Sequence, residues 1–295
     1  MTTDTLSTPV VQTAGLHRFA VLVALFALAA IVAGAVVTSI ERPIAATTAA
    51  VSASAAFQVW HRTIALVAGA LMVGLAFWLA FGKVQKGLRL LGWAVLAGAA
   101  VEAALGAQEV LRSLLPLSGI LHALLAYLFF AAVVVICVLT SESWSREPQW
   151  VQDTWRPSMR SLAIVMPAIV ILQITLGASF RYKALGVLWH IMNAMLVLLL
   201  ILIVCVFLIR QFPTHPVLRP AAVALAVLTG IQVLLGFTTF LMLLLFPESS
   251  PAVIVASALH AGTGALTLAA SCVLAVQIRR NIAAKDVTAR SVTAS

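Results

Sequence analysis

Charged side chains are scarce in this sequence: Asp, Glu, Lys and Arg make up 9% of its 295 residues, and hydrophobic residues make up 63%. Soluble domains carry about 25% charged residues, so this composition excludes an ordinary soluble protein. The mean hydropathy of +1.12 agrees with that exclusion. We expect an all-α polytopic membrane protein.

Cysteine is also rare, and its three residues Cys137, Cys205 and Cys272 fall in apolar stretches without a paired spacing. Neither a disulfide nor a thiolate metal site is therefore expected. The first 16 residues lack the basic region of a signal peptide, and the first apolar stretch is longer than a signal core. That stretch is expected to remain as a membrane anchor.

Apolar runs of about 20 residues, the length that a bilayer requires, recur eight times between polar breaks. The expected spans are 18–40, 57–82, 88–110, 117–140, 159–179, 185–209, 218–246 and 252–278. Polar stretch 141–158 is the expected linker between two four-helix bundles, 17–140 and 159–278, and the tails are 1–16 and 279–295.

Acidic residues number only nine against 18 basic ones, which gives a formal net charge of +9. The basic residues concentrate at both ends and in every second loop. The other side of the membrane has only Arg42, Arg62, Arg112, Arg181 and Lys183. By the positive-inside rule both termini are cytoplasmic, and the charge excess requires no nucleic-acid partner.

Four histidines lie near the start of every second apolar stretch. They are His61, His122, His190 and His260. An ionisable side chain inside hydrocarbon is costly, so four in matched positions predict a functional site in one half of the membrane. His17 and His215 lie in the cytoplasmic flanks and are expected to be solvated or interfacial.

The histidine contexts repeat. Trp60-His61 recurs as Trp189-His190, and Leu121-His122-Ala123 recurs as Leu259-His260-Ala261. A second motif ends in glycine in the preceding spans: Glu102 to Gly106, Gln173 to Gly177, Gln232 to Gly236 and, more weakly, Ala30 to Gly34. An even number of helices per unit predicts a parallel duplication of two four-helix bundles.

Two helices of each bundle offer one imidazole apiece, and a flat macrocycle between them would take both as axial ligands to iron. A single membrane histidine is more often a packing residue, but four in duplicated contexts favour haem. Zinc or copper is the competing metal, yet no carboxylate or thiolate joins the histidines at ligand spacing. The glycines expected to admit a porphyrin are Gly69, Gly106, Gly177, Gly236, Gly262 and Gly264.

Residues 18–278 resemble the haem A synthase family, on the duplicated bundles, the four histidines, the His61-Arg62 pair and the glycine motifs. These enzymes of the bacterial cytoplasmic or mitochondrial membrane oxidise the C8 methyl of haem O towards haem A. The resemblance implies resident haem b at His190 and His260, and the substrate haem O or haem A, or a second haem b, at the N-terminal pair. It implies as partners an electron donor, haem O synthase or a respiratory complex, and membrane lipid.

Two features depart from that family. Gln58 stands where the family has a catalytic glutamate, and a glutamine side chain cannot take up that proton. The outer loops 41–56 and 180–185 contain no cysteine pair. We hypothesise that Glu102, deep in its span, supplies the missing carboxylate as a proton acceptor or as a partner of Arg62. A buried ion pair with a structural role is the alternative.

Three functions therefore compete. The first is haem-dependent oxidation of a haem methyl, with Glu102 and Gln58 in the catalytic site and Arg62 facing the haem propionates. The second is a non-catalytic haem b protein for electron transfer or haem carriage, which the Gln58 substitution favours. The third, a transporter, is disfavoured because no matched Gly/Pro breaks interrupt the spans.

Overall fold

The computed structural model describes residues 14–41, 48–107, 116–153 and 156–283. Its helices are α1 (Ala14–Glu41), α2 (Thr48–Phe81), α3 (Lys86–Ala107), α4 (Leu117–Leu139), α5 (Glu142–Ser145), α6 (Met159–Arg181), α7 (Val187–Gln211), α8 (Leu218–Leu245) and α9 (Pro251–Asn281). Its strands are β1 (Val151–Gln152) and β2 (Ile282–Ala283). All helices except α5 are long and apolar enough to cross a membrane, which confirms the eight expected spans and the all-α class.

The helix boundaries follow the apolar runs closely, with one clear difference. The outer loop expected over 41–56 is wrong in its second part, because α2 already begins at Thr48. This segment is rich in alanine and free of glycine and proline, so its helix propensity is high. The end of the third span, 108–110, and the tail segments 1–13 and 284–295 lie outside the described residues.

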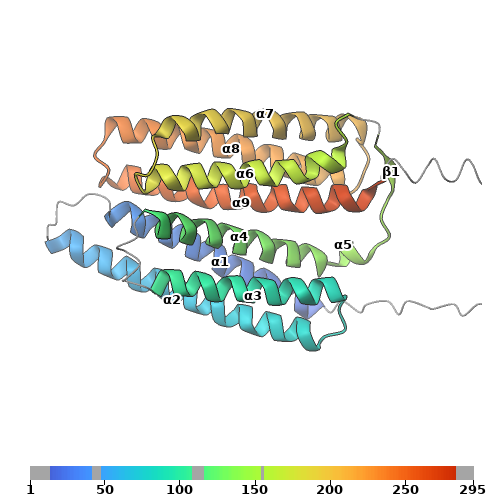
Figure 1. Cartoon of the computed structure of the whole chain (residues 1–295), viewed down its shortest axis with the longest axis horizontal. Coiled ribbons are helices and arrows are strands. Elements are labelled where there is room, and N and C mark those ends of the chain that lie inside the picture. The colour runs from blue at the N-terminus through green and yellow to red at the C-terminus, as the bar shows by residue number, and fades with distance from the viewer. Residues whose placement is uncertain (1–13, 42–47, 108–115, 154–155, 284–295) are drawn as a thin grey trace, which may run out of the picture.

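The long helices form two groups of four. Helices α1 to α4 pack against one another, as do α6 to α9, and Figure 1 shows the two groups one above the other. The groups meet through contacts of α9 with α1 and α4, and of α4 with α6. Helix α9 is the most buried of the eight candidate spans and contacts both groups, so it forms the middle of the molecule.

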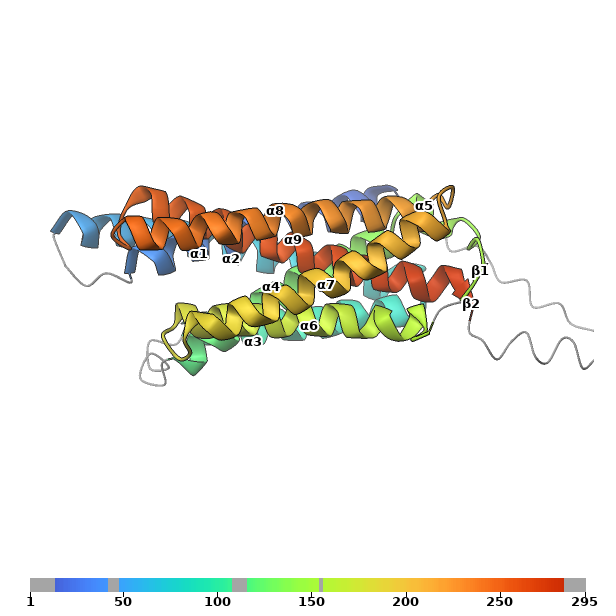
Figure 2. The ribbon, with the colours of Figure 1, turned by 90° about the horizontal axis from the view of Figure 1, so that it is seen from above.

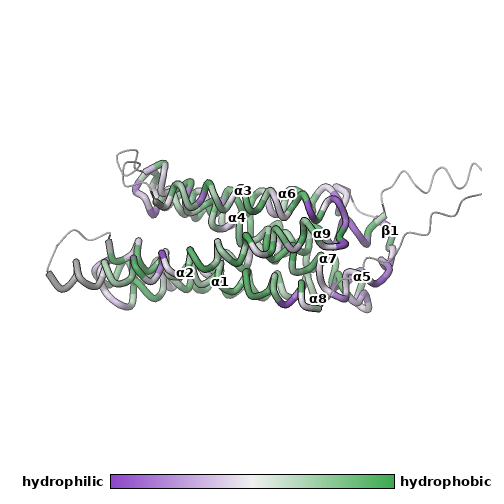
Figure 3. Tube along the Cα trace, turned by 90° about the horizontal axis from the view of Figure 1, so that it is seen from below, coloured by the Kyte–Doolittle hydropathy of each residue, from purple (hydrophilic) through white to green (hydrophobic). Residues whose placement is uncertain are grey.

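Each group consists of two helical hairpins. Far from β1, helices α1, α2 and α8 lie on one side, and α3, α6 and α7 lie on the other (Figure 2). Hydrophobic residues run along the helices, and hydrophilic residues concentrate at the end that holds α5 and β1 (Figure 3). We call this the linker end.

Hydrogen bonds hold the linker against two other segments, the end of α9 with β2 and the turn between α7 and α8. Strand β1 pairs in parallel with β2, and the Gln149 N–H donates to Asn281 Oδ1 at 3.1 Å. His215 Nε2 donates to the Gln149 carbonyl at 3.1 Å, while its Nδ1 accepts from the N–H groups of Val217 and Leu218. The expectation of a solvated or interfacial His215 is therefore wrong, because this ring is 6% exposed and closes the α7–α8 turn.

The other flanking histidine also has a partner in the fold. His17 is half-buried on α1, and its Nδ1 lies 3.0 Å from the carbonyl oxygen of Cys137 at the end of α4. It therefore joins the first and last helices of its group at the linker end.

We expect His215→Phe to lower the stability of the detergent-solubilised protein by about 1–3 kcal/mol, because phenylalanine leaves buried backbone groups without partners. Thermal unfolding followed by circular dichroism measures the change. Thr214→Val, at the exposed neighbouring position, is the control. Equal midpoints for the two variants would contradict this account of the linker.

Candidate site at two histidine pairs

The four membrane histidines come together as two pairs, one in each helix group. The ring centres of His61 on α2 and His122 on α4 lie 6.4 Å apart, with an angle of 89° between their planes. Those of His190 on α7 and His260 on α9 lie 6.2 Å apart at 83°. All four residues are half-buried and lie in the first half of their helices. Each pair therefore links the two hairpins of its group at the end away from the linker.

Every one of these imidazoles packs on a glycine of the preceding helix. A Cβ built on the glycine would lie 2.9 Å from the histidine Cε1 at Gly34 and Gly177, a distance that real Cβ atoms essentially never show, and 3.0 Å at Gly106 and Gly236, tighter than nine in ten real Cβ contacts. The four contacts are Gly34 with His61, Gly106 with His122, Gly177 with His190, and Gly236 with His260. Glycine is required at these positions because the imidazole occupies the space of a side chain.

This geometry changes the role expected for the glycines. Gly106, Gly177 and Gly236 leave space for an imidazole, and so does Gly34, whose motif is the weakest of the four. We call these four residues the seating glycines. A Cβ at Gly69 would meet nothing within 4 Å, whereas one at Gly262 would lie 2.9 Å from Val32 of α1. Gly262 therefore serves the contact between the two groups.

The residue one turn before each seating glycine contacts the same histidine. The Ala30 carbonyl oxygen lies 3.0 Å from His61 Nδ1, and the Gln173 carbonyl oxygen lies 3.2 Å from His190 Nδ1. A neutral imidazole that donates through Nδ1 carries its lone pair on Nε2. Such an Nδ1–H···O=C bond is the usual support of a metal-binding histidine.

The second histidine of each pair meets the side chain of that residue, as His190 also does, with Gln173 Nε2 3.1 Å from its Nδ1. Glu102 Oε1 lies 3.1 Å from His122 Nδ1, an ion-pair distance without hydrogen-bond alignment. Gln232 Nε2 lies 3.4 Å from His260 Nε2. Within the described residues, the buried atoms Glu102 Oε2, Gln232 Oε1 and His260 Nδ1 have no hydrogen-bond partner. Buried polar atoms of this kind indicate a site completed by water or a ligand.

The remaining expected residues are placed as follows. Gln58 is half-buried one turn before His61, and Arg62 is exposed on α2. Arg62 is the partner hypothesised for Glu102, but among the described residues the ion pair of Glu102 is with His122.

Sequence reasoning missed Asn193, which is 7% exposed. Its amide donates to Gln173 Oε1 at 2.9 Å, and Gln173 Nε2 donates to the His190 carbonyl at 3.0 Å. The available signal was an amide side chain inside an apolar run, one turn after a histidine. Neutral amides thus fix the backbone and side chains around His190.

Two further residues join the groups beside the histidine pairs. The hydroxyl of Tyr127 on α4 donates to the carbonyl of Ala261, next to His260, at 3.0 Å. The guanidinium of Arg181 at the end of α6 donates to Ser39 Oγ at 2.7 Å and to the Ala35 carbonyl on α1. Arg181 therefore lies between the two groups.

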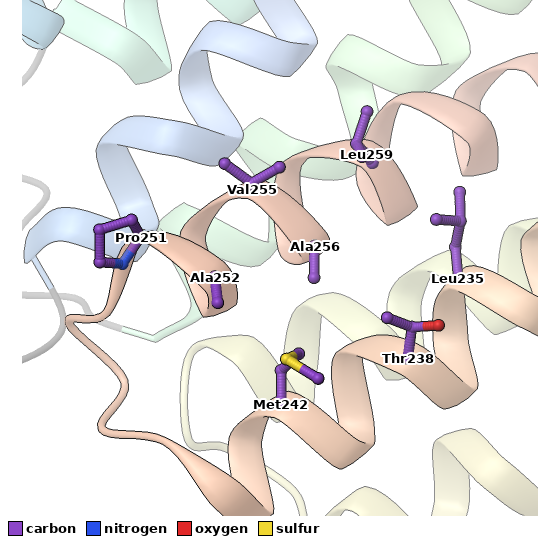
Figure 4. Close-up of a pocket in the computed structure, with 8 residues that line it drawn as sticks. All are labelled: Leu235, Thr238, Met242, Pro251, Ala252, Val255, Ala256 and Leu259. Atoms are coloured by element: carbon purple, nitrogen blue, oxygen red, sulfur yellow. The ribbon is translucent and has the colours of Figure 1, made fainter.

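Two apolar grooves on the molecule are lined without histidine. One of 450 Å³ lies between α8 and α9, where Thr238 and Met242 face Ala252 and Ala256 (Figure 4). Another of 560 Å³ lies between α1 and α2. Their linings are mostly apolar, as is typical of surfaces that lipid chains cover, and include no His, Cys, Asp or Glu.

Within the described residues, no group of three or more His, Cys, Asp or Glu side chains could hold a metal ion. Each pair offers two imidazoles as possible metal ligands. No protein-family model matches the chain, and neither does any curated protein.

We expect Gly236→Ala to destabilise the protein by about 1–3 kcal/mol, because the added methyl group would displace the His260 ring. Gly230→Ala, six residues earlier on the same helix, is the control because its Cβ would meet nothing within 4 Å. This control is expected to be neutral or stabilising by up to about 1 kcal/mol. Thermal unfolding in detergent measures both, and equal effects would contradict the seating role.

Proposed function

We propose that this chain is a membrane haem protein with one haem site at His61 and His122 and another at His190 and His260. The support is the ring spacing. A metal–imidazole bond is about 2 Å long and a ring nitrogen lies about 1 Å from its ring centre, so two imidazoles on one metal have centres about 6 Å apart. The observed 6.4 and 6.2 Å agree with that distance.

We also propose that the two helix groups are duplicated four-helix bundles in a bacterial cytoplasmic membrane, with both termini cytoplasmic. The four repeated glycine–histidine contacts support the duplication. The basic residues at the linker end, among them Arg160 and Arg279, support the orientation.

The surroundings of the two pairs support different roles. Neutral amides of Gln173, Asn193 and Gln232 lie around the C-terminal pair, which suits a permanently bound haem b. The N-terminal pair has the carboxylate of Glu102, which suits a site where protons are moved. We therefore place haem O or haem A, or a second haem b, at the N-terminal pair.

The function that we favour is oxidation of the C8 methyl of haem O towards haem A for cytochrome oxidase biogenesis. A bound haem supplies an iron that changes oxidation state and activates oxygen. Of the chain's own residues, the histidines hold and orient the macrocycle. Glu102, with Oε2 buried and without a hydrogen-bond partner, is the candidate proton acceptor, and Gln58 lies one turn from His61. The electron donor is a separate partner.

A second candidate is a non-catalytic haem b protein for electron transfer or haem carriage. Gln58 favours it, because an amide replaces the glutamate that the resembling family uses.

The haem proposal is tested by the pyridine haemochrome spectrum of the purified protein. We expect His190→Ala or His260→Ala to abolish binding at the C-terminal site, and His61→Ala or His122→Ala to abolish it at the N-terminal site. His17→Ala is the control, since its ring bonds the Cys137 carbonyl outside both pairs. Haem content that none of the four substitutions lowers would contradict the proposal.

The two candidate functions are separated by chromatography of the haem extracted after co-expression with a haem O synthase. We expect haem A or a hydroxylated haem O, and we expect Glu102→Gln to reduce that product at least tenfold. Haem b alone, with no oxidised product from the wild-type chain, would favour the non-catalytic candidate.

A further inference from the structure

The four positions one turn before the seating glycines are equivalent in the fold, but one differs in charge. Three of them, Ala30, Gln173 and Gln232, are neutral, whereas Glu102 carries a carboxyl group. Glu102 is also the only acidic residue in the eight candidate spans. Within the spans that the structure describes, the one carboxyl group therefore lies beside a single imidazole.

The contact between Glu102 and His122 is partly buried, and charges interact strongly in such surroundings. Glu102 Oε1 is 3.1 Å from His122 Nδ1, and the side chains are 18% and 30% exposed. At this depth the effective dielectric constant is far below that of water, so a nearby charge has a large effect. A carboxylate beside the second nitrogen of a metal-binding imidazole makes that ligand more basic.

The counterpart in the other group is neutral. Helix α8 places Gln232 at the position that Glu102 has on α3, and its amide lies 3.4 Å from the His260 ring. The two sites thus share the ring spacing and the glycine contact, but the residue one turn before the glycine carries a carboxyl group in one and a neutral amide in the other.

We infer that Glu102 makes the N-terminal histidine pair the site of lower reduction potential. This inference rests on the proposed haem binding. Ferric haem carries one more positive charge than ferrous haem, so a carboxylate beside its ligand stabilises the oxidised state of this one-electron couple. The amide of Gln232 gives no such net charge. Glu102 acts through His122 and is thus a positioning and tuning residue for this couple.

The test is an optical redox titration of the protein reconstituted with haem b in both sites. His190→Ala, which leaves only the N-terminal haem, assigns the two midpoints. We expect Glu102→Gln to shift the N-terminal midpoint upward and leave the other unchanged. Gln232→Glu is expected to shift the C-terminal midpoint downward, and the double exchange to reverse the order of the two sites. Glu248→Gln, at an exposed position between α8 and α9, is the control.

Unchanged midpoints in both variants, with haem content preserved, would overturn the inference while leaving haem binding in place. If Glu102→Gln loses its haem, the Gln232→Glu variant decides: a downward shift supports the electrostatic role, and no shift overturns it. A wild-type chain that takes up no haem b would overturn the proposed function and the inference together.

Discussion

The arrangement of the four membrane histidines depends on one steric constraint. Each imidazole occupies the space that a side chain would fill if the neighbouring helix did not have a glycine there. Four glycines provide this space on α1, α3, α6 and α8. Without a Cβ the helices of each hairpin approach closely, as small residues allow in membranes generally. The contact fixes where each ring lies, and the packing of the two hairpins then sets the 6.4 and 6.2 Å spacings within the pairs.

Around this common frame the two groups differ in their polar contacts. The C-terminal pair is surrounded by amides, while the N-terminal pair has the carboxylate of Glu102. Tyr127 and Arg181 join the groups next to the pairs. Tyr127 bonds the carbonyl of Ala261, next to His260, and Arg181 bonds that of Ala35, next to Gly34. A shift of one group relative to the other would therefore move both sites.

The sequence predicts the eight spans because a bilayer requires a fixed length of apolar residues. It also predicts which histidines share a group, because helix order determines that. The glycine seats, the Tyr127 bond and the burial of His215 could not be predicted, because they depend on how each helix is rotated about its axis. A membrane helix is apolar on its lipid side and its packed side alike, so hydropathy does not show the rotation. Glu102 was singled out by its depth, but its contact with His122 required the packing of α3 on α4.

The central claim is that each pair of imidazoles binds one iron between nearly perpendicular rings. Electron paramagnetic resonance of the oxidised, haem-loaded protein tests it most directly, because perpendicular axial imidazoles give low-spin ferric haem a strongly anisotropic signal with a large maximal g value. We expect this signal in the wild type and its loss at the C-terminal site in His260→Ala. A high-spin spectrum from the wild type, or a low-spin signal that survives substitution of all four histidines, would contradict the account.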